Sequence, residues 1–306
     1  MYFDIDNMEL STNNVKINTV NLTYQKIPSS LYEGAKNELT NLHLLNLAAE
    51  AETIATPCIY GRFLNDEHYL KTLSLVLNST HETRNRIIFF LKAILPKLKE
   101  KQSFLDIGPG DGLVTLPISQ HFKQVTVIDN NQKILNNLIT LFPTKTTYKK
   151  ISGSIVDAQL PSNSYDLATL SHILYYVSPS EWLNIVDVTY KSLTPDGLLV
   201  IVLSGDALDK ADLIRNFKGT IPPTDQLATL CISKFGHNNV ELYSSEEAFL
   251  SHSRQAMLCI SAFMLADAQV TASEEALTDH VEQKMKRSEN YFEMSTLQKY
   301  IVIRKQ

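Results

Sequence analysis

Three glycines on alternate positions give this sequence its first chemical signal. Gly108, Gly110 and Gly112 follow an apolar run that contains Asp106, and the mixed segment after them has the composition of a helix. Glycine tolerates positive φ and lacks the Cβ atom that would hold a ligand away from the backbone. A strand, a tight glycine turn and a helix start form the arrangement that brings backbone close to a cofactor.

A second carboxylate stands at the end of the next apolar run. Residues 125–129 read as a strand, and Asp129 lies 129 − 108 = 21 residues after the first glycine. A carboxylate at this place accepts hydrogen bonds from both hydroxyls of an adenosine ribose. A nicotinamide dinucleotide fold also places an acid here, but it expects G-x-G-x-x-G where this chain has G-x-G-x-G.

The glycine spacing and Asp106 resemble class I S-adenosylmethionine (SAM) dependent methyltransferases, and the resemblance covers residues 103–204. It implies an α/β, Rossmann-like fold with a mostly parallel seven-stranded sheet flanked by helices. N-terminal helices and a C-terminal insertion would cover the substrate. SAM is the implied cofactor. The residues assigned to it by the resemblance are Asp106, Gly108, Pro109, Gly110, Asp129, Asn130, Ser154, Ile155 and Ser171.

The resemblance also implies how these residues are used. Asp106 would stand near the methionine end of the cofactor, and the backbone of 108–110 would pass its sugar and amino acid portions. Ser154 and Ile155 would lie around the adenine. The alternatives that the residues leave open are an ordinary glycine turn with an acidic helix cap, and an ordinary polar loop after the third strand.

Further along, the chain looks like the histamine N-methyltransferases in the Leu-Tyr-Tyr-Val run at 174–177, the strand at 199–205 and the segment 300–303. This resemblance implies that Glu82 is a substrate-binding carboxylate and Tyr176 a substrate-facing aromatic. His172 stands where that family has glutamine, and Thr296 where it has asparagine. A different amine or imidazole-like acceptor is therefore implied. Glu82 can instead close a capping box, and His172 can be a core histidine.

The expected reaction is transfer of the SAM methyl to a nitrogen of a small amine, amino acid or imidazole-like molecule. The sulfonium is an activated donor, so alignment supplies much of the catalysis and no strong base is required. Methylation of oxygen or carbon, a catalytically silent SAM-binding or protein-interaction module, and a nicotinamide oxidoreductase remain as alternatives.

Composition limits the partners. A formal charge of −5 provides no global basic field for nucleic acid or anionic lipid, so we expect neither as a partner. The eight histidines form no H-x-x-x-H pair, and the three cysteines have no metal-ligand spacing, so no metal is expected. The N-terminus lacks a secretory signal, which predicts a cytoplasmic protein. The oligomeric state stays open.

The elements that must position these residues follow from hydrophobic periodicity. Alternating strands and helices predict parallel strands with crossover helices. The predicted strands are 103–107, 125–129, 148–152, 166–171 and 198–204, and the helices between and after them are 113–122, 131–141, 179–193 and 208–217. Before them we predict helices at 32–56 and 66–77 and one opened by a Ser79–Glu82 capping box. After them we predict a helix at 222–235, a strand at 240–243, a charged helix at 274–287 and a strand at 300–303.

We predict one domain preceded by an extension. Residues 1–30 are the extension, with an open choice between a loose hairpin and an unpacked tail. Residues 31–306 form the methyltransferase domain. Within it, 31–102 is a helical cap, 103–205 the SAM-binding core, and 206–306 the substrate-covering part with the closing strands.

Overall fold

The computed structural model describes residues 22–28, 30–33, 66–142, 146–219, 221–265, 273–289 and 291–306. The open choice between a hairpin and a tail at 1–30 concerns residues that lie mostly outside these ranges, and the predicted helix at 32–56 lies almost wholly outside them. So does Cys58, whereas Cys231 and Cys259 are buried free thiols.

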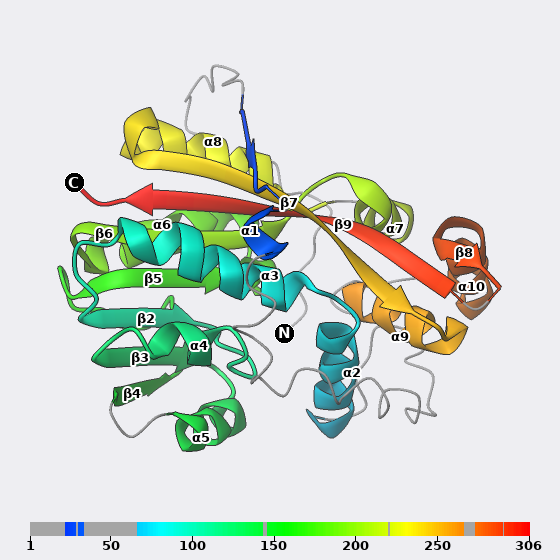
Figure 1. Cartoon of the computed structure of the whole chain (residues 1–306), viewed down its shortest axis with the longest axis horizontal. Helices are drawn as coiled ribbons and strands as arrows, with labels where there is room; N and C mark the ends of the chain where they lie inside the picture. The colour runs from blue at the N-terminus through cyan, green and yellow to red at the C-terminus, as the bar shows by residue number, and fades with distance from the viewer. Residues whose placement is uncertain are drawn as a thin grey trace.

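One sheet organises the described chain (Figure 1). Its strands follow the order β1-β7-β9-β6-β5-β2-β3-β4, with the short β8 paired to β9. The bounds are β1 Gln25–Lys26, β2 Ser103–Ile107, β3 Gln124–Asp129, β4 Thr147–Ser152, β5 Tyr165–Ser171, β6 Leu193–Ser204, β7 Val240–Ser251, β8 Lys286–Ser288 and β9 Tyr291–Arg304. Strands β2 to β6 pair in parallel, whereas β9 runs antiparallel to β6 and β7. The predicted mostly parallel sheet is confirmed, but the described sheet has nine strands where seven were expected, since the short β1 and β8 also pair into it.

Helices cover both faces of this sheet. Their bounds are α1 Ser30–Glu33, α2 Asp66–Asn78, α3 Glu82–Phe89, α4 Thr115–Ser119, α5 Gln132–Leu141, α6 Pro179–Ser192, α7 Leu208–Lys218, α8 Thr224–Phe235, α9 Arg254–Met264 and α10 Glu274–His280. The chain continues from α3 into a π-helical turn, Phe90–Ile94, and a 3₁₀ turn, Leu95–Lys97. Two more 3₁₀ turns are Leu174–Tyr176 and His237–Asn239, and a second π turn is Val281–Met285.

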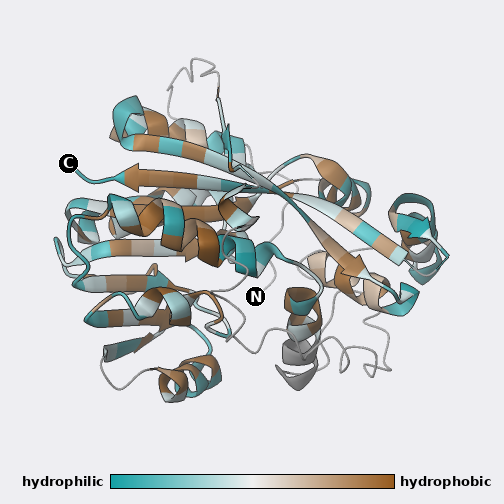
Figure 2. Cartoon of the chain, in the orientation of Figure 1, coloured by the Kyte–Doolittle hydropathy of each residue, from teal (hydrophilic) through white to brown (hydrophobic). Residues whose placement is uncertain are grey.

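Two apolar clusters lie on the two faces. One joins α6 and α8 to the sheet through residues such as Trp182 and Leu227. The other joins α3, α4 and α5 to the opposite face through residues such as Phe89, Ile118 and Leu135. Figure 2 shows the matching hydrophobic colouring along the central strands. Burial on both faces explains why these strands read as continuous apolar runs.

The outer halves of β7 and β9 leave this core as a long two-stranded arm (Figure 1). A third apolar cluster forms there from α2, α7, α9 and the arm, around Phe249, Met257 and Met294. A bridge between Thr80 and Phe249, and a hydrogen bond from the Leu250 amide to the Ser79 carbonyl of 2.7 Å, tie the chain before α3 to β7. The start of α3 is therefore held at the root of the arm.

Three sequence predictions need correction. The Ser79 hydroxyl bonds back to the Leu75 carbonyl, and the Glu82 amide donates to Thr80 Oγ1, so Ser79 and Glu82 form no capping box. The strands predicted at 240–243 and 300–303 are much longer in the structure. The prediction was too short because the outer halves of these strands carry polar residues that hide the apolar pattern. The predicted helix at 274–287 ends earlier, and its last residues form β8.

Candidate active site

The glycine turn lies at the carboxyl end of β2, between β3 and β5. All three glycines have positive φ, with values of 71°, 58° and 82° at Gly108, Gly110 and Gly112. A Cβ atom on Gly108 would lie 2.1 Å from Ile173 Cγ2, and one on Gly112 would lie 2.1 Å from Leu138 Cδ1. A Cβ on Gly110 would meet nothing within 4 Å. The outer glycines are thus needed for packing, and Gly110 presents bare backbone to open space, as a cofactor requires.

Asp106 supports this turn from beneath. Its carboxylate is buried and accepts hydrogen bonds of 2.5 Å from Thr115 at the start of α4 and from Thr169 on β5. Burial raises the pKa of Asp106, and the two hydroxyls oppose that change. Both oxygens have protein partners, so Asp106 ties β2, β5 and α4 together at the turn.

Asp129 ends β3 beside the turn, where a ribose carboxylate is expected. Its Oδ1 accepts from the Asn131 amide at 2.7 Å, and its carbonyl accepts from Gly153. Burial raises the pKa of the Asp129 carboxyl, and the backbone amides of Asn131 and Asn130 oppose the rise. The Asn130 residue itself is exposed. Asp129 is only partly buried and can still receive a ligand hydroxyl.

The expected adenine residues follow β4. Ser154 is partly buried, and its hydroxyl accepts from the Val156 amide at 3.2 Å. The Ile155 side chain is buried in the cluster under α6, whereas Val156 is 50% exposed. Contact between Ile155 and a base would therefore be made by its backbone or the edge of its side chain.

On the other side of the turn, α3 places a buried ion pair against the end of β5. Arg86 Nη2 lies 2.5 Å from Glu82 Oε1, and Arg86 Nη1 donates to Ser171 Oγ at 2.7 Å. His172 Nε2 lies 2.9 Å from the same Glu82 oxygen. The structure thus brings together three residues predicted from sequence, Glu82, Ser171 and His172, through Arg86, which was not predicted.

The ion pair sets the charge states around it. Burial alone would raise the pKa of Glu82, but Arg86 and then His172 outweigh it and lower the value to about 2. Burial and Arg86 lower the pKa of His172, with Glu82 opposing them. The Nδ1 atom of a neutral imidazole can accept from the Tyr175 hydroxyl, 3.3 Å away, while Nε2 makes the close contact with Glu82 without hydrogen-bond geometry.

The two tyrosines after β5 have different environments. The Tyr175 hydroxyl accepts from the Ser204 amide as well as contacting His172, and burial raises its pKa to about 12. Tyr176 is 63% exposed. The described contacts therefore bring Tyr175 into the group around Glu82, while Tyr176 stays a predicted substrate residue at the surface.

A band of polar side chains continues from the turn across the sheet. Asp106 pairs with Thr169, Ser204 with Gln298, Gln298 with Ser245, and Thr296 with Glu247. Residues paired in register face the same side, and this is the side that α3 covers. Lys210, on α7, reaches the band and donates to Ser204 Oγ at 2.8 Å. Thr296, the position expected to bind substrate, is buried within it.

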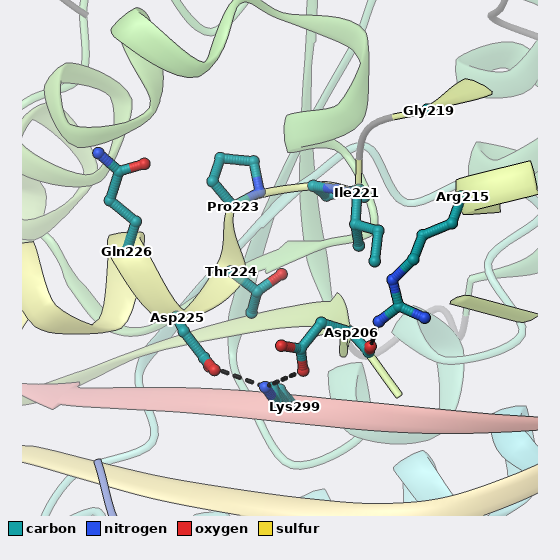
Figure 3. Close-up of a pocket in the computed structure, with 10 residues that line it drawn as sticks. Asp206, Arg215, Gly219, Ile221, Pro223, Thr224, Asp225, Gln226 and Lys299 are labelled. Atoms are coloured by element: carbon teal, nitrogen blue, oxygen red, sulfur yellow. Dashed lines mark hydrogen bonds and ion pairs between the residues drawn. The ribbon is translucent and has the colours of Figure 1, made fainter. Parts of the chain in front are cut away.

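A surface hollow of about 440 Å³ lies elsewhere, at the start of α8 (Figure 3). Lys299, on β9, contacts Asp206 at 2.9 Å and Asp225 at 2.8 Å, and Tyr24 donates to the same Asp225 oxygen. None of the predicted site residues lines this hollow. The lysine has two anionic partners, so we interpret the group as a structural clamp between β9, the end of β6 and α8.

The described ranges hold neither a cluster of metal ligands nor a membrane-spanning helix. Within them, no three histidine, cysteine, aspartate or glutamate side chains are grouped as metal ligands. No helix in the same part of the chain has the length and apolar character to cross a bilayer.

The open glycine turn, Asp129 at the end of β3 and the order of the strands in the sheet together define a class I SAM-dependent methyltransferase. Residues 79–238 match the family model described as a methyltransferase domain, which is more than half of the chain. The chain belongs to this family, and its cofactor is SAM. Gly110 and Asp129 fit that cofactor, since one leaves open space over bare backbone and the other offers a carboxylate beside it.

Solved structures show the same fold. A protein from Bacillus halodurans C-125 assigned as a methyltransferase has a TM-score of 0.51 and 15% identity, covering 73% of this chain and 98% of that one. The YcgJ protein from Bacillus subtilis has a TM-score of 0.50 and 14% identity, covering 73% and 99%.

A carboxy-S-adenosyl-L-methionine synthase from Shewanella halifaxensis is 27% identical over 103 residues. The match spans 31% of this chain and 42% of that relative.

Sequence reasoning missed Arg86, Lys210, Glu247 and Gln298. A signal for Arg86 was present, because Glu82 and Arg86 are four residues apart on a predicted helix, the spacing at which opposite charges meet. Glu247 and Gln298 lie outside the short strands predicted at 240–243 and 300–303. Their polar character made those parts of the chain look like loops.

Proposed function

We propose that this protein transfers the methyl group of SAM to a nitrogen of a small amine, amino acid or imidazole-like molecule. The observation that carries the proposal is the polar band under α3, which begins beside the glycine turn and ends at Glu247. The likeness to histamine N-methyltransferases at 174–177 and 300–303 also supports a nitrogen acceptor.

The chain's own residues divide the work. Gly108, Pro109 and Gly110 give the cofactor a backbone surface, and Asp129 receives its ribose hydroxyls. Ser154 and Ile155 lie beside the adenine. When bound, the cofactor supplies an activated methyl group on a sulfonium, so the protein's task is alignment and exclusion of water.

The wall formed by Glu82, Arg86 and His172 stands between the turn and the acceptor end of the band. Arg86 compensates the charge of Glu82. Glu82 therefore serves mainly to hold Arg86 and His172 in place, and less as a free counterion for the acceptor. Tyr176, at the rim, offers an aromatic face to a cationic acceptor, an interaction worth about 0.5–2 kcal/mol.

Calorimetry with SAM tests the cofactor half. In D129A we expect at least a tenfold loss of SAM affinity, about 1.4 kcal/mol. The matched control is D212A, which removes an exposed aspartate paired with Arg215 and should bind SAM as the wild type does. Unchanged binding in D129A would remove Asp129 from the cofactor site.

Formation of S-adenosylhomocysteine with a panel of small amines and imidazoles tests the acceptor half. Methylation found only on phenols or carbon acids would favour the oxygen or carbon alternative. SAM binding without turnover on any acceptor would favour a catalytically silent module.

A further inference from the structure

Among the described residues, the far end of the polar band holds buried atoms that have no hydrogen-bond partner. On β7 and β9 they belong to Ser245, Glu247, Thr296, Gln298 and Tyr300. The ladder places Ser245 opposite Gln298 and Glu247 opposite Thr296, so these side chains share one face. Unpartnered buried polar groups are costly and rare. Their concentration on one face indicates a place where a bound molecule supplies the partners.

Gln298 is the clearest case. Its side chain is 0% exposed, and neither its amide nitrogen nor its amide oxygen has a partner. The neighbouring residue Thr296 is 1% exposed, and its hydroxyl also has no hydrogen-bond partner among the described residues. Together they offer donors and acceptors to a polar ligand, with no net charge.

Glu247 adds a carboxylate of a different kind from Glu82. Its Oε2 accepts from Asn85 at 2.8 Å, while Oε1 is buried without a partner. Burial raises the pKa of Glu247 to about 7 and the charge of Glu82 adds to the rise, whereas the Asn85 hydrogen bond, the nearby Ser245 hydroxyl and the charge of Arg86 oppose it. Glu247 therefore gains and loses a proton near neutral pH, whereas Glu82 stays ionised.

The two carboxylates are linked through α3. Asn85 holds Glu247, and the adjacent Arg86 holds both Glu82 and Ser171 at the end of β5. One helical turn thus spans the distance between the glycine-turn side and the arm. The titratable groups around Glu247 are Tyr32 from α1, Glu82 and Arg86 from α3 and Tyr300 from β9, with His172 and Lys210 beyond Glu82.

We propose that Glu247, Thr296 and Gln298 form the acceptor subsite, in which Glu247 Oε1 binds an acceptor ammonium or N–H and takes its proton. The inference rests on the proposed function. The ammonium passes one proton to the carboxylate and becomes a neutral amine. The nitrogen lone pair then bonds to the methyl carbon as its bond to sulfur breaks, and that bond's electron pair stays on sulfur.

The first experiment compares E247Q with E246Q in the full chain. Glu246 is the matched control because it is exposed and paired with Lys26 at 2.9 Å. Propylamine, piperidine, imidazole and histamine are the probe acceptors, with S-adenosylhomocysteine formation followed from about pH 5 to about pH 9. SAM affinity is measured separately by calorimetry.

We expect the wild-type rate on the best probe to rise with pH through about 7, as Glu247 loses its proton. E247Q should lose about 10²-fold in rate and should lose this rise, with SAM affinity within about twofold. E246Q should match the wild type. A rate in E247Q within about threefold of the wild type overturns the proposal, as does a wild type that binds SAM but methylates none of the probes. A wild type that does not bind SAM overturns the proposed function instead.

A second variant, Q298L, separates recognition from folding. Replacing an unpartnered buried amide by an apolar side chain of similar size should leave the urea midpoint unchanged or raise it. We expect KM for the acceptor to rise about tenfold while SAM affinity is kept. An unchanged acceptor KM would remove Gln298 from the subsite. A lowered urea midpoint would show that Gln298 serves the fold, and would also remove it.

Discussion

The glycine turn and the β7–β9 pair stand at opposite ends of one polar band and differ in how their polar groups are satisfied. At the turn, both Asp106 oxygens accept hydroxyl hydrogens. At the β7–β9 pair, neither amide atom of Gln298 has a partner within the described part of the chain. The first end is complete without a ligand except for the open space over Gly110. The saturated groups support the backbone of the cofactor site, and the unsaturated groups are the ones we propose to bind the acceptor.

The largest expected effect concerns Arg86, which joins the two ends. R86M leaves Glu82 buried without its cation, so we expect the free energy of unfolding to fall by about 3–5 kcal/mol. Urea unfolding of the full chain measures it. R215M is the control, because Arg215 is 45% exposed in its pair with Asp212, and it should lose less than about 1 kcal/mol. Equal losses in the two variants would refute a special role for the buried pair.

The two glutamates should give opposite pH dependences. The pKa of Glu82 is lowered from 4.5 to about 2, so its stabilisation is full above pH 4.5 and is lost as pH falls through 2. The pKa of Glu247 is raised from 4.5 to about 7, so its contribution is full below pH 4.5 and is lost as pH rises through 7. Each amounts to about 3 kcal/mol.

Urea unfolding at a series of pH values measures both limbs. E247Q should flatten the decline between pH 4.5 and 7 and leave the acid limb in place. A decline that persists unchanged in E247Q would assign it to another group.

The turn itself can be divided by two alanines. G108A drives a Cβ into Ile173, and we expect a loss of about 1–3 kcal/mol in the free energy of unfolding. G110A meets no atom and should lose only about 1–2 kcal/mol, because of its positive φ. Although G110A should lose less stability than G108A, we expect it to cause the larger loss of SAM affinity. Thermal unfolding without ligand and SAM calorimetry give the two readouts, and the reverse ranking would show that the cofactor does not approach Gly110.

The smallest effect is expected at the hollow near α8. K299M removes a buried ammonium whose partners Asp206 and Asp225 are 57% and 43% exposed. These carboxylates can be hydrated, so the free energy of unfolding should change by about 1 kcal/mol or less. SAM affinity should not change. A tenfold loss of SAM affinity would connect this hollow to the active site.

The cofactor end was readable from the sequence because its signals are local. Gly108, Gly110, Asp106 and Asp129 lie within about one strand, turn and helix of each other, and the apolar strands around them are buried on both faces. The fold class and the inner strands were predicted correctly for the same reason. Asp106 was expected near the cofactor, and the structure adds that two threonines occupy its oxygens.

The acceptor end was not readable, because it depends on register between distant segments. Gln298 meets Ser245 only after β9 has paired with β7, across more than fifty residues of chain. The polar residues that we propose to bind the acceptor also erase the alternation that would mark this region as strand. Arg86 could have been found from its spacing to Glu82, but its contact with Ser171 requires the packed fold.

The position of β9 in the sheet has a consequence for synthesis of the chain. β9 follows the other described strands in the chain, and it lies between β6 and β7. Until it has left the ribosome, β7 lacks the neighbour that joins it to β6. At about 5–20 residues per second, the glycine-turn half emerges roughly ten to forty seconds before the strand that carries Thr296 and Gln298. The nascent chain therefore exposes the residues of its cofactor end before it holds the strand with Thr296 and Gln298, which joins β7 to the rest of the sheet.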